Sequence, residues 1–210
     1  VGDDTADRLL AKLIPRVEAL KVGPYTSGND MDYGPVVTAA AKAHIERLVQ
    51  TGIDQGANLV VDGRDFNLQG YEDGFFVGAH LFDNVTKDMD IYKYEIFGPV
   101  LSTVRAKTYE EALGLAMDHE YGNGTAIFTR DGDTARDFAN RVNVGMIGIN
   151  VPIPVPLAYH TFGGWKKSVF GDLNQHGPDA FKFYTRTKTV TARWQSGTKE
   201  GGEFSIPLME

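Results

Sequence analysis

Strand-like and helix-like segments alternate along the middle of the chain, and this order limits the possible folds more than any other feature. Short runs rich in apolar and β-branched residues at 100–106, 125–129 and 146–150 are typical of strands. An amphipathic helical pattern lies between each pair of these runs. Because parallel strands need crossover helices, the order predicts an α/β fold with an open, mostly parallel sheet and flanking helices.

The helix starts and strand ends in this region predict where a site would form. Thr108 followed by Glu111 is typical of a capping box, and we expect Asp133 to cap the next helix. Ligands of open α/β sheets bind at the carboxyl ends of the strands. The loops after Thr129 and Asn150 are therefore the first places to look for a site.

The N-terminal third predicts two helices followed by two strands. Apolar residues recur at helical spacing through the first twenty positions, and Pro15 inside this pattern predicts a kink or a break. Thr38 is placed to cap a second amphipathic helix that ends at Gly56. Apolar and aromatic runs at 57–62 and 75–82 then indicate strands.

The C-terminal segment departs from the alternation. Residues 181–194 are rich in β-formers and are followed by no crossover helix. An unpaired strand of this length would template aggregation, so we expect it to join a sheet elsewhere in the protein or in another subunit. We therefore predict a homo-oligomer, either a dimer or a tetramer, with residues 195–210 as a mobile tail.

Charge and hydropathy argue against two classes of partner. The formal net charge of −7, with no basic run, would repel nucleic acid. The longest weakly polar stretch, residues 144–158, contains three prolines and is shorter than the ~20 residues of a membrane-spanning helix. The first residues lack the charged and apolar regions of a signal peptide. We expect a cytoplasmic protein with no membrane span.

The chain contains no cysteine. It can therefore form no disulfide and supply no thiolate, either as a metal ligand or as a nucleophile. The histidines follow none of the usual metal-ligand spacings, so we expect no metal site; they are His44, His80, His119, His160 and His176. No residue of the chain is predicted to be the catalytic nucleophile.

Several segments resemble the aldehyde dehydrogenase superfamily. The hexapeptide Glu95-Ile96-Phe97-Gly98-Pro99-Val100 is similar to a hallmark of that family. Other family-like segments occur in the family's order at 34–38, 74–77, 121–129 and 162–168, the last reading Phe-Gly-Gly-Trp-Lys-Lys-Ser. The resemblance covers nearly the whole chain.

Details within these segments resemble one branch of the family, the CoA-acylating methylmalonate-semialdehyde dehydrogenases. Thr161 stands where a proline commonly precedes Phe162, and Ser-Val-Phe-Gly at 168–171 replaces the common Ser-Gly-x-Gly. The segments 121–125 and 145–150 also resemble this branch. The resemblance implies a catalytic domain whose C-terminal part is residues 1–180, followed by an oligomerisation strand (181–194) and a tail (195–210).

The resemblance implies roles for three residues. Glu95 would accept hydrogen bonds from the nicotinamide ribose hydroxyls of NAD, as a carboxylate with two acceptor oxygens can. Phe97 would pack against the nicotinamide ring, and Phe162 would line the aldehyde pocket. Without the resemblance, Glu95 would be interpreted as a solvated charge and Phe97 as a core side chain.

The resemblance also implies a reaction and a limit on this chain. In the family a cysteine thiolate attacks the semialdehyde, the adduct gives a hydride to NAD, and coenzyme A takes the acyl group from the resulting thioester. With loss of CO2 the products would be propionyl-CoA or acetyl-CoA. The cysteine and the Rossmann domain lie upstream in relatives, so we expect a missing N-terminal part and no activity from these 210 residues alone.

Two alternatives stay open. The intact protein could be an NAD-dependent aldehyde dehydrogenase that releases a free acid instead of a thioester. In a different class, the chain could be a non-catalytic interaction module that pairs with a full-length subunit through residues 181–194. The product of the reaction would separate the first alternative, and the encoded sequence before Val1 would separate the second.

Overall fold

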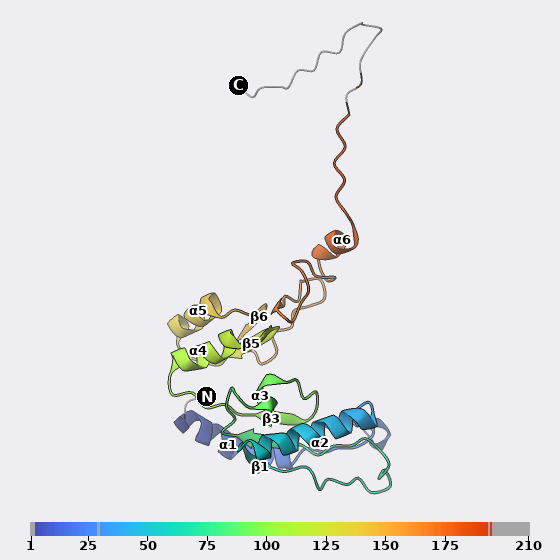
Figure 1. Ribbon diagram of the computed structural model, residues 1–210, viewed down its shortest axis with the longest axis vertical. Coiled ribbons are helices and arrows are strands. Elements are labelled where there is room, and N and C mark those ends of the chain that lie inside the picture. Colours follow the sequence, from blue (N-terminus) through green and yellow to red (C-terminus); the bar gives the residue numbers. More distant parts are fainter. Residues whose placement is uncertain (1–2, 29, 193, 195–210) are drawn as a thin grey trace. The chain divides into compact units, whose positions relative to one another are not determined.

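The computed structural model divides the chain into two compact units. The structure describes residues 3–28, 30–192 and 194, shown in Figure 1. Unit 1 contains Val1–Val155 and Phe162–Gly171, and unit 2 contains Pro156–Thr161 and Asp172–Glu210. The tail at 195–210, which the sequence predicts to be mobile, lies outside the described residues.

Unit 1 begins with two long helices and a three-stranded sheet (Figure 1): α1 (Asp3–Glu18), α2 (Ala39–Asp54), β1 (Asn58–Val61), β2 (His80–Asp83) and β3 (Val100–Ser102). The strand order is β1-β2-β3. β1 runs antiparallel to β2 with an irregularity in register, whereas β2 runs parallel to β3. The short helix α3 (Asp90–Lys93) lies in the connection between β2 and β3.

Both helices form where the patterns predict them. The Thr38 hydroxyl caps α2 by accepting a hydrogen bond from the amide of Ala41 at 3.1 Å. Of the two outcomes predicted at Pro15, a kink or a break, the break does not occur, since α1 continues through this residue to Glu18. Proline removes a single backbone donor, and at this position only the last turn of the helix follows it, where the amide of Ala19 still donates to the Pro15 carbonyl.

The core of this part lies between α2 and the sheet. Ile45 and Leu48 of α2 and Phe82 of β2 are almost completely buried and belong to one apolar cluster. Burying a side chain of this size stabilises a fold by about 1.5–3 kcal/mol. This cluster fixes the sheet against α2, and Ile96 packs against its edge.

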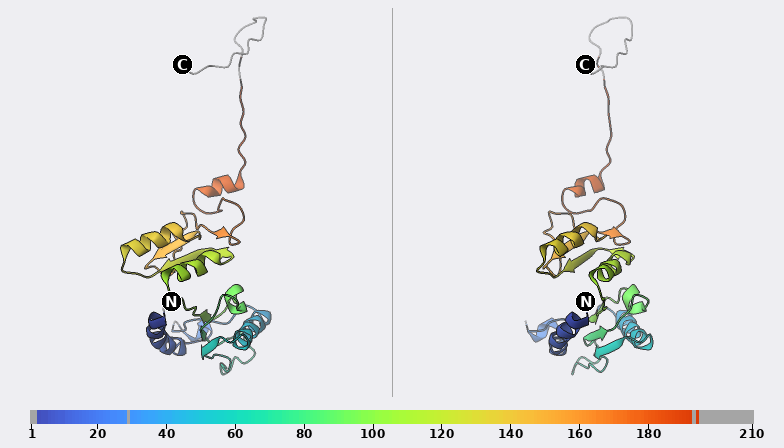
Figure 2. Two further views of the ribbon diagram at one scale, coloured as in Figure 1. Left: turned by 60° about the vertical axis from the view of Figure 1, so that its left-hand side comes forward. Right: turned by 90° about the vertical axis from the view of Figure 1, so that its left-hand side faces the viewer.

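A second group of elements follows in unit 1: α4 (Tyr109–Asp118), β5 (Gly124–Ile127), α5 (Gly132–Arg141) and β6 (Met146–Ile149). β5 and β6 are parallel, with register from Gly124↔Met146 to Ile127↔Ile149. Figure 2 shows α4 and α5 beside this pair of strands. Leu113 of α4 and Phe138 of α5 are buried in one cluster that Ile127 and Ile147 of the strands also contact. The predicted strand–helix–strand unit is therefore present.

The N-cap of α5 differs from the prediction. Asp131, and not Asp133, caps the helix, and its carboxylate accepts a hydrogen bond from the amide of Thr134 at 2.6 Å. Asp133 lies in the first turn and pairs with Arg136. Either aspartate would be favourable near the helix N-terminus. The cap is the last residue in the extended conformation, because its side chain can reach the free amides of the first turn, and that residue is Asp131.

The strands do not form the single open sheet that the alternation predicts. In the described part of the chain they form three small sheets, and the third pairs β4 (Tyr121–Gly122) with β7 (Trp165–Lys166) in antiparallel orientation. Of the predicted strands at 75–82 and 100–106, only residues 80–82 and 100–102 lie in strands. Strand propensity marks residues that can be extended, but a ladder also needs a neighbour to accept its hydrogen bonds.

Unit 2 contains one short helix, α6 (Asp179–Tyr184). The prediction of a strand from residue 181 is therefore wrong for residues 181–184. An acidic residue in the first turn and Lys182 in the last complement the helix dipole. Residues 185–192 have no strand partner among the residues that the structure describes. The oligomerisation strand stays a prediction over that segment.

No helix in the described ranges is both long enough and apolar enough to cross a bilayer.

Candidate functional site

The loop at residues 94–98 presents two of the predicted site residues to solvent. Glu95 is exposed, and the Phe97 side chain is 81% exposed. Ile96 between them packs against the core cluster. A Cβ added at Gly98 would lie 2.4 Å from the Cδ1 atom of Ile45, so this glycine lets the loop lie directly against α2. The core holds the loop on one side, and Phe97 projects from the other.

Phe97 also has an unfavourable backbone conformation. Its φ angle is 55°, in the left-handed region that side-chain-bearing residues rarely adopt. Such a residue costs on the order of 1–3 kcal/mol unless its surroundings impose the geometry. Here the packing of Ile96 and Gly98 imposes it. The Phe97 ring, which is exposed, therefore adds little to the packing of this chain although its backbone is strained.

A cavity of about 500 Å³ joins this loop to other parts of unit 1. Its wall contains Glu95 on one side and Lys167 and Ser168 on another. The other lining residues come from α3, its C-cap and the segment after α4: Tyr92, Lys93, Tyr94, His119, Tyr121 and Asn123. Segments more than 70 positions apart in the sequence therefore meet around Glu95.

Hydrogen bonds to backbone groups fix the aromatic side chains of this cavity. The Tyr92 hydroxyl donates to the Leu115 carbonyl at 3.0 Å, and burial, followed by the nearby Asp118 carboxylate, raises the pKa of this phenol. The His119 Nδ1 atom accepts from the Tyr121 amide at 3.2 Å, so its Nε2 atom donates to the Tyr92 carbonyl at 3.2 Å. These bonds leave the phenol protonated and select one tautomer of the imidazole.

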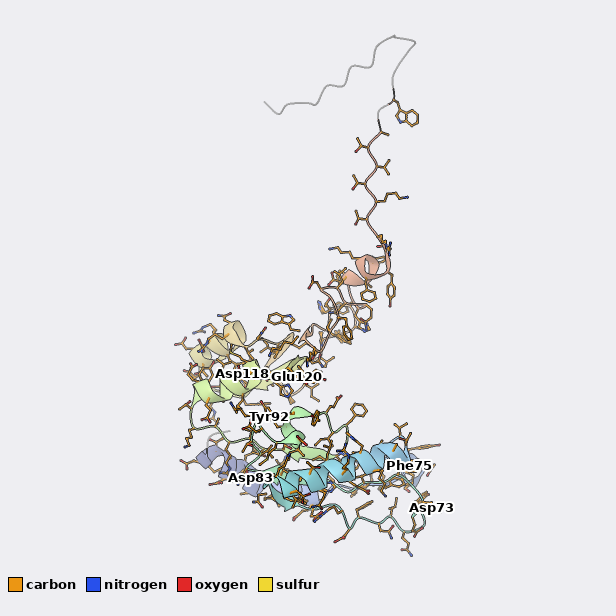
Figure 3. The ribbon with its side chains drawn as sticks, viewed as in Figure 1. Asp73, Phe75, Asp83, Tyr92, Asp118 and Glu120 are labelled. Atoms are coloured by element: carbon orange, nitrogen blue, oxygen red, sulfur yellow. The ribbon has the colours of Figure 1, made fainter. Side chains whose placement is uncertain are left out.

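A second cavity, of about 740 Å³, adjoins the first and shares Tyr92, Lys93, Tyr94 and His119 with it. Four acidic side chains line it, against two lysines: Asp88, Glu111, Asp118, Glu120, Lys87 and Lys93. Tyr92, Asp118 and Glu120 are labelled in Figure 3. None of the predicted site residues lines this larger space.

The segment Phe-Gly-Gly-Trp-Lys-Lys-Ser, which we call the glycine loop (residues 162–168), packs backbone against backbone. A Cβ at Gly145 would lie 1.9 Å from the Gly164 nitrogen, and a Cβ at Gly163 would lie 2.5 Å from the Gly145 carbonyl oxygen. Gly163 has a φ of 68° and Gly164 a φ of 128°. Only glycines permit this approach and these angles. Phe162 at the start of the loop is half-buried and does not line the 500 Å³ cavity.

Two lysines of the glycine loop are bound to the region after α4. The Lys166 ammonium donates to the carbonyls of Met117 and His119, at 2.6 and 3.0 Å. The Lys167 ammonium pairs with Glu120, which raises the pKa of the lysine. The glycine loop is thus held by charge-assisted contacts in addition to its glycine packing.

The carboxyl ends of β5 and β6 meet as the alternation predicts. The Asn150 side chain accepts a hydrogen bond from the Thr129 amide at 3.0 Å and donates to the Thr129 carbonyl at 3.1 Å. Asn150 itself has a φ of 58°, which asparagine tolerates better than most residues. The two loops predicted as site candidates are therefore bound to each other. Neither contributes to the cavity around Glu95.

The structure thus brings Glu95 together with the far end of the glycine loop and leaves Phe97 and Phe162 outside that cavity's lining. Sequence reasoning missed the anchoring by Lys166 and the role of Gly145. A glycine directly before a strand and a lysine after two glycines are signals too common to single out. In the described part of the chain, no group of three or more acidic or histidine side chains is arranged to hold a metal ion.

Comparison with known proteins finds similar sequences among the aldehyde dehydrogenases. The family model for the aldehyde dehydrogenase family matches residues 1–190. Malonate-semialdehyde dehydrogenase of Pseudomonas aeruginosa is 57% identical over 210 residues, which are 100% of this chain and 42% of that protein. The mitochondrial acylating methylmalonate-semialdehyde dehydrogenase of Arabidopsis thaliana is 49% identical over 186 residues, covering 88% of this chain and 30% of that protein.

Solved structures agree in fold. A Sinorhizobium meliloti structure, assigned as a methylmalonate-semialdehyde dehydrogenase and complexed with NAD, aligns with a TM-score of 0.90 and 69% identity over 94% of this chain and 40% of its own. Methylmalonate-semialdehyde dehydrogenase of Oceanimonas doudoroffii aligns with a TM-score of 0.88 and 51% identity, with coverage of 94% and 40%. The chain spans less than half the length of each relative. It is homologous to the malonate- and methylmalonate-semialdehyde dehydrogenases, and it belongs to the aldehyde dehydrogenase family.

Proposed function

We propose that this chain is the C-terminal portion of an NAD-dependent, CoA-acylating methylmalonate- or malonate-semialdehyde dehydrogenase. The intact enzyme would convert semialdehyde, CoA and NAD into propionyl-CoA or acetyl-CoA, CO2 and NADH. The hydride would come from the aldehyde carbon and the thioester sulfur from CoA. Similarity to a malonate-semialdehyde dehydrogenase and to an acylating methylmalonate-semialdehyde dehydrogenase supports this choice within the family.

The observation that carries the proposal is the exposed, strained Phe97 two residues from the exposed Glu95. The two side chains belong to one loop that Gly98 holds against buried Ile45. A loop held this rigidly presents a flat aromatic face and a carboxylate in a fixed relation. That is the chemistry needed to recognise a pyridine nucleotide.

These residues fit the nicotinamide half of NAD. The Glu95 carboxylate has two acceptor oxygens, which match the two hydroxyls of the nicotinamide ribose. The Phe97 ring can cover the nicotinamide and exclude water from it. NAD, when bound, supplies the acceptor for the hydride. The residues of this chain bind and orient it.

Phe162 would form part of the aldehyde pocket at the start of the glycine loop. It is half-buried, and Gly163 and Gly164 fix the backbone that follows it. A semialdehyde is small and partly apolar, so an aromatic wall suits its carbon chain.

The nucleophile has to come from polypeptide outside these residues, because the chain has no cysteine. We propose that this additional part of the same protein supplies the thiolate and that the chain alone does not reduce NAD. We further propose a cytoplasmic homo-oligomer, dimer or tetramer, in which residues 185–192 add to a sheet of another part or subunit.

A chimera tests the proposal directly. This chain would replace the matching 42% of the Pseudomonas aeruginosa relative, and NADH formation would be followed at 340 nm with malonate semialdehyde and CoA. We expect the chimera to form NADH and acetyl-CoA, and the isolated chain to form neither. A folded chimera without NADH formation would contradict the proposal, and a free acid in place of the thioester would favour a non-acylating enzyme.

Two substitutions in the chimera test the cofactor residues. E95Q removes the charge but keeps the shape, and we expect it to raise the KM for NAD about tenfold through weaker hydrogen bonds to the ribose. F97A removes an exposed ring, so we expect a change in unfolding free energy within about 0.5 kcal/mol but a clear loss of NAD affinity. Unchanged KM values for NAD in both variants would refute the assignment.

A further inference from the structure

We propose that Lys166 is a positioning residue for the aldehyde pocket. Its ammonium ties the glycine loop to the C-terminal end of α4 and so holds Phe162 in place. This inference rests on the proposed role of Phe162. It adds a residue whose side chain binds the end of α4 and acts through the backbone of the glycine loop.

The first support is the chemistry of the contact. The last carbonyls of a helix have no partner within the helix, and they carry the negative end of its dipole. α4 has no basic residue in its last turn. Lys166 supplies the missing cation from 47 to 49 positions away, with hydrogen bonds of 3.0 Å to the His119 carbonyl and 2.6 Å to the Met117 carbonyl. An ammonium has three donors, so one side chain can satisfy both carbonyls.

The second support is the backbone of Lys166. Its φ angle of 55° lies in the left-handed region, where glycine is the favoured residue. Two glycines already stand close by at 163 and 164. A glycine at 166 would adopt this conformation without strain but would have no ammonium. The chain carries a lysine at a position whose backbone favours glycine, which indicates that the side chain matters there.

The third support is the arrangement of contacts around the loop. Gly163 and Gly164 lie against the Gly145 backbone on one side. At the other end, Lys166 is bound to the end of α4, and the Ser168 hydroxyl accepts from the Gly122 amide at 3.0 Å. Phe162 is attached directly to the glycine pair. Lys166 supplies the bonds of this end to α4, and without them the pairing of β7 with β4 and the Ser168 contact would hold the loop less tightly.

The closing experiment compares four substitutions in the chimera. K166M removes the charge, K166G removes the charge and relieves the backbone strain, and K166R restores a cation. K12M is the matched control, because it removes an exposed lysine of α1 that does not line the cavity around Glu95. We expect K166M and K166G to raise the KM for the semialdehyde about tenfold with kcat within about twofold, since they loosen a binding wall and leave the reacting groups in place. K166R should recover most of the loss, and K12M should behave like the wild type.

The KM for NAD should stay within about twofold in all four variants, because Glu95 and Phe97 are held by Gly98 on Ile45 and not by Lys166. Wild-type kinetics for K166M and K166G would overturn the positioning role, and so would a loss of kcat with an unchanged KM for the semialdehyde. If the parent chimera is inactive, the proposed function fails instead. Hydrogen exchange on the isolated chain then tests the anchor: faster exchange at residues 163–168 in K166M than in K12M supports it, and equal exchange refutes it.

Discussion

Replacing Gly145 with alanine should detach the glycine loop from β6 and destabilise unit 1. The new Cβ would lie 1.9 Å from the Gly164 nitrogen and 2.5 Å from its Cα, and the first separation has to grow to at least 3.0 Å. The clashing atoms are backbone atoms, so no side chain can rotate to relieve it. Overpacking of this kind costs about 3 kcal/mol, the upper part of the usual range.

The size of the effect follows from what the displacement breaks. The Gly145 amide donates to the Gly122 carbonyl at 3.0 Å, and β4 pairs with β7 next to this contact. Moving the glycine loop away from Gly145 strains both. With a urea m-value of about 2 kcal/mol/M, a loss of about 3 kcal/mol lowers the unfolding midpoint by about 1.5 M.

The matched control is the same substitution at Gly114. A Cβ there would meet no atom within 4 Å, and the residue lies inside α4. Alanine should therefore stabilise the chain by about 0.5–1 kcal/mol, because it restricts the unfolded state and favours the helix. Urea unfolding followed by circular dichroism measures both variants. Equal stability of G145A and the wild type, with unchanged exchange at residues 163–168, would refute the reasoning.

Two further predictions concern charges in unit 1. The side chain of Asp83 is 5% exposed and pairs with Arg105 at 2.7 Å, so R105M should cost about 3 kcal/mol at pH 7 by leaving this carboxylate buried and unpaired. Arg105 lowers the pKa of Asp83, so the wild type gains stability above the ordinary pKa of 3.8 and loses it as the pH falls through the lowered value. The difference between wild type and R105M should therefore shrink in acid unfolding below that pH, and a constant difference would contradict the assignment. D131A removes the N-cap of α5 and should lower the free energy of unfolding, measured with heat or urea, by about 1 kcal/mol. D133A should lower it by less than about 0.5 kcal/mol, because Asp133 is an exposed residue of the first turn. A larger loss for D133A than for D131A would show that Asp133 is the cap, as the sequence predicted.

Helix caps and buried helix faces could be predicted from the sequence, because they depend on local interactions. Thr38 and Thr108 are N-caps as predicted, each accepting a hydrogen bond at 3.1 Å from an amide three residues later. The helical stripe that includes Ile45 and Leu48 is buried as its spacing predicts. Caps and stripes are recognisable because they depend on neighbours within one or two helical turns. The error at residues 181–184 comes from the same local rules, applied to a segment that forms a helix instead.

The candidate site divides in the same way. The hexapeptide around Glu95 and Phe97 was recognisable by resemblance, but the exposure of Phe97 and its left-handed backbone depend on Gly98 lying against Ile45. No sequence pattern states that contact, because the two residues are 53 positions apart. Phe97 is 81% exposed in this chain, so it does not belong to the core that the described residues form.

The sequence alone determined the alternation of strands and helices, the caps at Thr38 and Thr108, and the absence of a thiol nucleophile from this chain. These follow from residue identity and short-range spacing. The tertiary structure decided that the strands form three small sheets, that Asp131 and not Asp133 caps α5, and that Lys166 binds the end of α4. Each of these depends on which free backbone groups a side chain or strand can reach in three dimensions, and that reach is set by packing between residues distant in the chain.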